Sequence, residues 1–202
     1  MYLDVEGADP GRIYALLTGI VAPRPIAWVS TLDARGRRNL APFSFYNVFG
    51  TNPPAVVFSP VGKRDGSPKD TLRNIRATGE FVISSAVRGL ADQVNISSKE
   101  LPPGDDEFAL AGLAAAPSTI VGPPRVAASP ASLECRLIRV VPVGDGPGSA
   151  NLVIGAVVAI HAEDAILDAE GHIDPLKLAA IGRLNRDYYS TTTDLFELRR
   201  PS

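Results

Sequence analysis

The sequence predicts a mainly β protein, an antiparallel barrel with helices at its periphery. The chain contains 18 glycines and 18 prolines, which indicate many turns between short valine-rich runs. The clearest helical pattern follows the third predicted strand, and regular alternation of strands and helices does not occur. A length of 202 residues suits a single domain over residues 1–202 and is long enough to bury a hydrophobic core. We expect the body of this domain to span about residues 12–198.

The first predicted strands form a hairpin followed by a third strand. Residues 26–47 are predicted as a β-hairpin with Gly36 at the tip of its turn. Pro23 and Pro25 suit the start of a strand or a sheet edge. The run "PAVVFS" predicts a strand buried on both faces, because its residues are continuously apolar.

A helix is predicted directly after the third strand, within "KRDGSPKDTLRNIRATGEF". Ser67 can cap its start, Pro68 suits its first position, and the charge of Asp70 favours the helix dipole in the first turn. Gly79 can end the helix in a left-handed conformation.

The second half of the chain predicts two long strands among short elements. "EFVISSA" is expected as a strand, and short helices are expected in "RGLADQVNISS" and "LPPGDDEFALAGL". Alternation in "ASLECRLIRVVPV" places Cys135 inward, and "NLVIGAVVAIHAED" is apolar on both faces, as a central strand would be. The loop between them, "GDGPGSA", lacks a following Lys-Ser/Thr and is predicted as a plain hairpin loop. A short hairpin, a short helix and an extended tail are expected over residues 165–174, 175–184 and 194–201.

Composition argues against several classes of function. A net charge of −2 argues against binding nucleic acid through bulk electrostatics. The longest apolar run, residues 152–160, is too short to span a bilayer, so no membrane partner is expected. The first residues are polar and acidic, unlike a signal peptide, and a single cysteine forms no internal disulfide. We therefore expect a cytoplasmic protein.

Hydrolytic and metal chemistry find little support in the sequence. The two histidines, His161 and His172, lie eleven residues apart, without a second cysteine or a His-Glu-x-x-His motif, so no metal site is expected. Neither lies near a Gly-x-Ser-x-Gly motif. His161 is either a hydrogen-bonded histidine at the barrel rim or a functional group, and His172 is expected on the surface. Cys135 is predicted to be a core residue rather than a nucleophile.

Two neighbouring features predict a site for a planar, phosphorylated ligand. Lys69 and Thr71 lie at the start of the predicted helix, where free N–H groups attract anions, and Ser59 ends the preceding strand. The alternative is a capped helix end with a solvated lysine, and both interpretations stay open. Residues 41–60, "APFSFYNVFGTNPPAVVFSP", carry no charge, and the rings of Phe43, Phe45, Tyr46 and Phe49 lie close together within them. This segment is either a core hairpin or a wall for a flat aromatic cofactor.

Taken together, four blocks of the sequence resemble the flavin reductase-like family of FMN-binding split-barrel proteins. They are "PRPIAWVSTLDARGRRNLAPFSFYNVFGTNPPAVVFSP", "KDTLRNIRATGEFVI", "ADQVNISSKELPPGDDEFALAGL" and "SLECRLIRVVPV". The resemblance implies an antiparallel split β-barrel with peripheral helices, forming a homodimer with one FMN per subunit near the interface. It implies an FMN-dependent oxidoreductase that transfers hydride through flavin N5, with NAD(P)H as the donor and a partner monooxygenase as a receiver of reduced flavin.

Two other functions stay open at this point. One is an FMN-dependent oxygenase or oxidase acting on a small organic substrate, and the other is a non-catalytic flavin electron carrier. No catalytic residue is assigned, because a flavin carries the hydride chemistry itself.

The resemblance also implies which residues contact the cofactor. Those implied to line the isoalloxazine ring and its pyrimidine edge are Asn39, Ser44, Phe45, Tyr46 and Asn47. Those implied to hold the phosphate and ribityl chain, or to lie near the phosphate, are Ser59, Lys69, Thr71, Asn74 and Lys99.

The chain departs from the family pattern at three places. Asn151 stands where reductases of this type often carry a histidine, and Ala156 stands where they often carry a glutamate. Residues 183–189 are "RLNRDYY", where relatives often have Arg-Leu-Gly-Gly. These departures weaken the expectation of a nicotinamide donor and leave the expectation of FMN binding unchanged.

Overall fold

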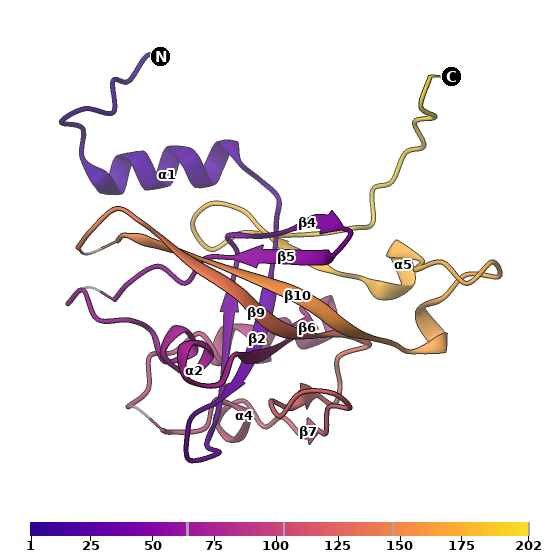
Figure 1. Cartoon of the computed structure of the whole chain (residues 1–202). Coiled ribbons are helices and arrows are strands. Elements are labelled where there is room, and N and C mark those ends of the chain that lie inside the picture. The colour runs from indigo at the N-terminus through magenta and orange to yellow at the C-terminus, as the bar shows by residue number, and fades with distance from the viewer. Residues whose placement is uncertain (64, 103, 147, 202) are drawn as a thin grey trace.

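A computed structural model describes residues 1–63, 65–102, 104–146 and 148–201 of the chain (Figure 1). Within these residues, the central element is a seven-stranded antiparallel sheet with the order β3-β2-β6-β9-β10-β5-β4. Its strands are β2 (Ala27–Leu32), β3 (Arg38–Phe43), β4 (Tyr46–Thr51), β5 (Pro54–Phe58), β6 (Glu80–Ser85), β9 (Ala131–Val143) and β10 (Ala150–Ala162). The mainly β, antiparallel barrel predicted from the sequence is confirmed, and β10 is a central strand as expected.

The sheet curls into a split barrel because its two ends come together. The rings of Phe43 on β3 and Phe58 on β5 pack with their centroids 5.2 Å apart, although the two strands lie at opposite ends of the strand order. The Ser59 N–H donates to the carbonyl of Phe45 at 2.9 Å. The hairpin predicted over residues 26–47 therefore ends at Phe43, and the corner that follows it leads into β4 at the other end of the sheet.

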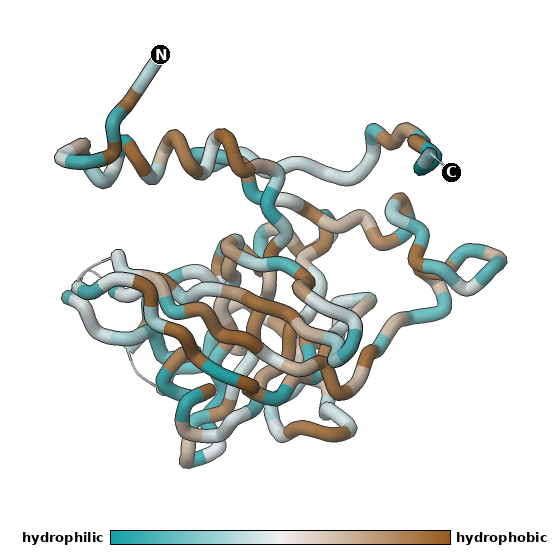
Figure 2. Tube along the Cα trace, turned by 45° about the horizontal axis from the view of Figure 1, so that its top comes forward, coloured by the Kyte–Doolittle hydropathy of each residue, from teal (hydrophilic) through white to brown (hydrophobic). Residues whose placement is uncertain are grey.

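The barrel interior is apolar and is filled partly by helix α2 (Asp70–Thr78). Leu72 and Ile75 of this helix pack among buried side chains from β2, β3, β5, β6, β9 and β10. In Figure 2, hydrophobic residues gather on the strands of the sheet, while the peripheral turns are hydrophilic. Cys135 lies inward and fully buried, as predicted, and burial raises the pKa of its thiol to about 12. It is a core residue that stays protonated.

A second apolar cluster lies on the opposite face of β2 and β3, because successive residues of a strand point to opposite faces. Trp28 and Leu40 pack there beneath helices α3 (Ala91–Ile96) and α4 (Glu107–Leu110). Trp28 is fully buried, and its indole N–H donates to the Ser97 hydroxyl at 2.9 Å. Trp28 therefore belongs to the core.

Small elements surround the barrel. Among the described residues, β1 (Arg24–Pro25), β11 (Ile181–Arg183) and β12 (Tyr189–Thr191) form a second sheet. The remaining short elements are β7 (Ala115–Ala116), β8 (Arg125–Val126), the 3-10 helices η1 (Arg88–Leu90) and η2 (Asp164–Ile166), and α5 (Pro175–Leu178). Leu167 and Ile173 form the bridge of the expected short hairpin, and the C-terminal tail is extended (Figure 1).

Helix α1 (Pro10–Ile20) was not predicted from the sequence. It stands apart from the sheet at the N-terminal end of the chain (Figure 1). Asp9 caps it by accepting the N–H of Arg12 at 2.7 Å, and Pro10 occupies its first position. Both signals are present in the sequence and suffice to predict a helix start. In the described part of the chain, no helix is long and apolar enough to cross a membrane.

Three predicted details are corrected. Helix α2 begins at Asp70 with Lys69 at its N-cap, because the Ser67 hydroxyl donates to Asp65 at 2.6 Å instead of capping. Strand β5 is buried on one face, with Val56 buried and Val57 half-buried, because successive side chains point to opposite faces and only one of these faces the barrel core. The helix predicted over residues 175–184 ends early, and its second half forms β11.

Candidate functional site

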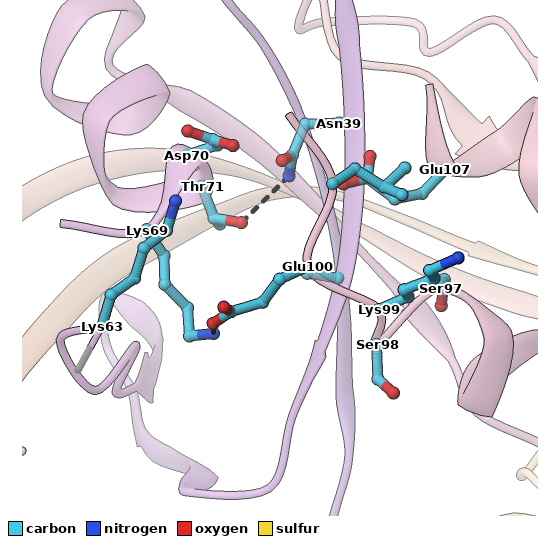
Figure 3. A pocket seen from close by; sticks show the side chains of 12 residues that line it. Asn39, Lys63, Lys69, Asp70, Thr71, Ser97, Ser98, Lys99, Glu100 and Glu107 are labelled. Atoms are coloured by element: carbon cyan, nitrogen blue, oxygen red, sulfur yellow. Dashed lines mark hydrogen bonds and ion pairs between the residues drawn. The ribbon is translucent and has the colours of Figure 1, made fainter. Parts of the chain in front are cut away.

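A cleft opens between the start of α2, strand β3 and the segment that follows α3 (Figure 3). It contains about 380 Å³ of space, part of it open to solvent. The residues that line it are Asn39, Ala41, Lys63, Lys69, Asp70, Thr71, Ser97, Ser98, Lys99, Glu100, Leu101 and Glu107.

Two buried hydrogen bonds join α2 to strands β2 and β3 beside this cleft. The Asn39 amide donates to the Thr71 hydroxyl at 3.0 Å (Figure 3). The Asn74 amide donates to the Thr31 hydroxyl, also at 3.0 Å. All four side chains are buried. These bonds fix α2 against β2 and β3, and they therefore hold Lys69 in place at the helix start.

The start of α2 is an anion-binding feature. Lys69 occupies the N-cap position, and no side chain among the described residues caps the helix. The first N–H groups of a helix have no partner within the helix, and the helix dipole adds partial positive charge at this end. Thr71, in the first turn, is almost fully buried. An uncapped helix start beside a lysine in a cleft suits a phosphate.

Lysines and carboxylates share the cleft. The Lys69 ammonium lies 3.2 Å from the Glu100 carboxylate, whose side chain is 66% exposed. Such an exposed pair contributes little free energy, so an anion of higher charge can compete for Lys69. Asp70 pairs with Arg73 along the helix surface. Lys63 and Lys99 add two further cations to the lining.

Glu107 lies at the back of the cleft and is buried. Its carboxylate accepts the N–H of Leu40 at 3.0 Å. Burial raises the pKa of Glu107, although the bond from Leu40 acts in the opposite direction. The Glu107 carboxyl therefore keeps its proton to a higher pH than an exposed glutamate does.

The cleft continues into a groove lined by both apolar and polar side chains. Ala41, Lys69 and Ser98 line both, so the two form one continuous depression. The groove contains about 550 Å³, part of it open to solvent. Its other lining residues are Tyr14, Pro42, Phe43, Ser44, Phe45, Ser59 and Val61. The Phe45 ring is 39% exposed and meets the edge of the Tyr14 ring with a centroid distance of 6.4 Å, so α1 closes one side of the groove.

Ser59 is an unsatisfied polar group in this groove. The Ser59 hydroxyl is buried, and it has no hydrogen-bond partner among the described residues. Ser59 is 6% exposed. Leaving a buried hydroxyl unpaired costs about 1–3 kcal/mol. A polar atom of a ligand in the groove would provide the missing partner.

The structure brings most of the predicted cofactor residues together. Those that line the cleft or the groove are Asn39, Ser44, Phe45, Ser59, Lys69, Thr71 and Lys99. Tyr46, Asn47 and Asn74 do not line it. Tyr46 packs against the barrel core, where burial raises its pKa to about 12, and Asn47 is exposed and accepts the N–H of Val48. The aromatic segment is divided between two environments, since Phe43 and Tyr46 pack in the core and Phe45 lines the groove.

Several lining residues were missed. Tyr14 comes from the unpredicted helix α1, whose cap and proline give a usable signal. Glu100 and Glu107 carry no local signal, because their place in the cleft depends on long-range packing of the segment after α3.

The histidines lie outside this site. His161 Nε2 is 2.6 Å from the carboxylate of the fully buried Glu134, so the structure supports the hydrogen-bonded interpretation. His172 is exposed in a turn, as predicted, and lies near Asp168 and Glu170. These three could supply ligand atoms to an ion, but exposed acidic groups commonly gather without one.

The fold agrees with that of flavin-dependent oxidoreductases, the class to which the matching family and the similar structures belong. The chain belongs to the flavin reductase-like family, since the family model for the flavin reductase like domain matches residues 21–177. An uncharacterized protein of Deinococcus radiodurans is 41% identical, over 98% of this chain and 89% of its own length.

Two solved structures are similar over nearly the whole chain. Nitrilotriacetate monooxygenase component B from Bacillus cereus is 33% identical with a TM-score of 0.92, covering 98% of each chain. The 2-nitrobenzoate 2-nitroreductase NbaA of Pseudomonas fluorescens is 29% identical with a TM-score of 0.88, covering 100% of this chain and 97% of its own.

Proposed function

We propose that this flavoprotein binds FMN and acts as an NAD(P)H-dependent flavin reductase. The observation that carries the proposal is the continuous depression described above. One end is an uncapped helix start with lysines, and the other is a groove with aromatic walls, in whose described lining the charged residue is Lys69, shared with the cleft. FMN has the same division, with a phosphate at one end and a flat ring at the other.

At the phosphate end, each residue has a distinct role. Lys69 and the free N–H groups of α2 hold the phosphate, and Lys99 lies on its approach. Thr71 and Asn39 orient one another through their hydrogen bond and face the same space. Asn74 acts indirectly, because its bond to Thr31 anchors the helix rather than reaching the cleft.

At the ring end, Ser44 and Phe45 form the wall of the groove, and the Ser59 hydroxyl supplies a polar contact to the ribityl chain. Tyr46 and Asn47 support this wall from behind, through the core and through the turn into β4. FMN, when bound, supplies hydride transfer at its N5 atom. The protein residues orient the ring and exclude water from it, and neither role requires a catalytic acid or base.

We further propose that the protein acts as a homodimer in the cytoplasm and delivers reduced flavin to a partner monooxygenase. Val48 and Phe49 are 60% and 69% exposed on the edge strand β4, and an exposed apolar edge of this kind favours pairing with another chain. The similarity to a component of a nitrilotriacetate monooxygenase supports the partner. A single buried cysteine suits a reducing compartment. A monomeric mass by light scattering at micromolar concentration would contradict the dimer.

Preference for FMN over FAD tests the cofactor assignment. A terminal phosphate dianion gains most at a helix start, whereas FAD replaces it with a diphosphate that carries adenosine. We expect the apo-protein to prefer FMN by at least about tenfold, or about 1.4 kcal/mol, in fluorescence titrations. Equal dissociation constants would show that the phosphate end is open to larger groups.

Anaerobic stopped-flow mixing tests the reductase activity. The FMN-loaded protein is mixed separately with NADH and with NADPH while the absorbance of oxidised flavin is followed. Rapid bleaching by either donor is the expected result. Persistent colour with both donors would contradict the reductase, and would favour an oxygenase, an oxidase or an electron carrier.

A further inference from the structure

A third pocket adjoins the groove at Pro42, Ser44 and Ser98, which line both. It contains about 730 Å³ of space, part of it open to solvent. Its other lining residues are Ile26, Val94, Asn95, Arg183, Asp187 and Tyr189. Of the residues assigned to FMN, Ser44 lines this pocket, so the pocket lies beside the ring end of the proposed flavin site.

Arg183 is held in a defined orientation at this pocket. It pairs with Tyr189 across β11 and β12, and its guanidinium carbon lies 4.6 Å from the centroid of the Tyr189 ring. Its Nη2 donates to the carbonyl of Arg186. A guanidinium has five N–H donors in a planar fork that matches a carboxylate, so donors remain after this bond. Arg183 is therefore preorganised to bind a planar anionic group.

Part of the pocket wall is apolar. Ile26 and Val94 are buried side chains of the second core cluster, and Pro42 adds the surface of its ring. Asn95 and Ser98 contribute polar groups from α3 and the residues after it. The pocket thus combines a cationic fork and an aromatic ring with apolar surface, which is the composition of a small-molecule site.

Arg24 makes the surroundings of the pocket more positive. This side chain is buried, and its Nε reaches the Ser44 hydroxyl at 3.5 Å. Its remaining partners are the neutral carbonyls of Thr18, Val21 and Leu184. Burial lowers the pKa of Arg24, and the Arg183 guanidinium also lowers it. The nearest carboxylate to Arg183 in the described lining is Asp187, which lies 3.6 Å away and is fully exposed.

We propose that this pocket binds a planar organic monoanion, such as an aromatic carboxylate, with the carboxylate on Arg183 and the ring against the apolar wall at Pro42. This inference rests on the proposed function, since the ligand then lies beside the flavin ring as a second substrate. Arg183 and Asp187 are the charged residues of the described lining, and the buried Arg24 adds a second guanidinium behind Ser44, so that one positive charge is in excess. The excess of one positive charge matches a monoanion rather than the pyrophosphate of a dinucleotide.

Benzoate and benzamide provide the first test on the unmodified protein loaded with FMN. The two have the same ring and similar shape, and only benzoate is charged. We expect benzoate to bind and to perturb the absorption spectrum of the flavin, and benzamide to bind at least about tenfold more weakly, as the loss of a charged hydrogen bond predicts. Equal affinities, or no binding of benzoate, would overturn the proposal.

Substitution of Arg183 provides the second test. We expect Arg183→Gln to weaken benzoate binding about ten- to a hundredfold and to leave FMN affinity unchanged. Arg183→Lys, which keeps the charge but loses the fork, is expected to fall between the two. Arg35→Gln, in the exposed turn between β2 and β3, is the matched control and should change neither affinity.

Two further measurements distinguish a failure of the pocket proposal from a failure of the proposed FMN-dependent function. Calorimetric titration of the apo-protein with benzoate tests the pocket even if FMN does not bind, so the failure of the proposed function is recognised separately. If Arg183→Gln weakens binding of NADH and leaves that of benzoate unchanged, the pocket is a nucleotide site and the proposal is wrong.

Discussion

Lys69 and Glu100 face one another at the mouth of the cleft, with Lys69 Nζ 3.2 Å from Glu100 Oε1 (Figure 3). Lys69 is the N-cap of α2, and Glu100 lies in the segment after α3. The same ammonium is proposed to hold the flavin phosphate. Glu100 is therefore a competitor of the ligand, and this relationship gives a prediction about affinity.

Glu100→Gln is expected to tighten FMN binding by about two- to fivefold, because an exposed ion pair contributes at most about 1 kcal/mol. Riboflavin, which has no phosphate, should bind the variant and the unmodified protein equally. Glu163→Gln, at an exposed position beyond β10, is the control and should change neither affinity. Fluorescence titration of the apo-proteins measures all of these constants. An unchanged FMN affinity in Glu100→Gln would show that Glu100 does not compete with the phosphate.

Ser59→Ala is expected to affect stability and binding differently. The Ser59 hydroxyl is buried without a partner, so its removal from the apo-protein should leave the free energy of unfolding unchanged or raise it. FMN affinity should fall about two- to tenfold, which corresponds to one lost hydrogen bond of about 0.5–1.5 kcal/mol. Urea unfolding and flavin titration measure the two quantities. A less stable apo-protein with unchanged FMN affinity would assign Ser59 a structural role instead.

Gly155→Ala is expected to destabilise the barrel. A Cβ atom at Gly155 on β10 would lie 2.3 Å from Cζ of Phe81, a fully buried ring that packs edge-on against Phe58. Overpacking of this kind costs about 1–3 kcal/mol of the free energy of unfolding, measured in urea. Gly89→Ala is the matched control, because a Cβ there meets no atom within 4 Å.

Replacing the Phe81 ring with a smaller side chain tests the same contact between residues 155 and 81 from the other side. Combining Gly155→Ala with Phe81→Leu should recover part of the lost stability relative to the sum of the two single variants. Strictly additive losses would mean that the added methyl group does not press on Phe81.

Glu134 is expected to make stability depend on pH in the acid range. Burial would raise its pKa, but N–H groups of Thr119, Ile120 and Val121 and a bond from His161 together lower it to about 2. Its ordinary value is 4.5, so its contribution is complete above pH 4.5 and is lost as pH falls towards 2. A shift of the pKa from 4.5 to about 2 corresponds to a contribution of about 3 kcal/mol by linkage.

Comparison with Glu134→Gln measures this contribution. The unmodified protein should be the more stable of the two at pH 7, and the difference in free energy of unfolding should shrink as the pH is lowered below 4.5. A difference that stays constant down to pH 3 would show that the charge of Glu134 does not stabilise the fold.

Local sequence patterns were enough to predict most strands and the helix that carries the site. Alternation placed Cys135 inward, and Gly79 marked the end of α2, because both depend on local geometry. The position of Lys69 at a helix start also follows from local spacing. The N-cap residue could not be predicted in this way, because the Ser67 hydroxyl can bond either to the helix start or to Asp65, and it bonds to Asp65.

Long-range contacts could not be predicted from local patterns. Arg24 reaches the carbonyl of Leu184 across 160 positions of the sequence, and Glu134 binds a loop and a histidine on another strand. Arg183 and Tyr189 form a pocket only because β11 and β12 pair beside α3. Each of these arrangements depends on tertiary packing, which no periodicity in the chain reveals.

Binding of FMN and riboflavin to Lys69→Ala tests most directly the central claim that the start of α2 holds a flavin phosphate. A charged hydrogen bond to phosphate contributes about 1.5–3 kcal/mol, so FMN affinity is expected to fall about ten- to a hundredfold. Riboflavin carries the same ring and ribityl chain without the phosphate, and its affinity is expected to stay unchanged. Equal losses for the two ligands, or no loss of FMN affinity, would contradict the claim.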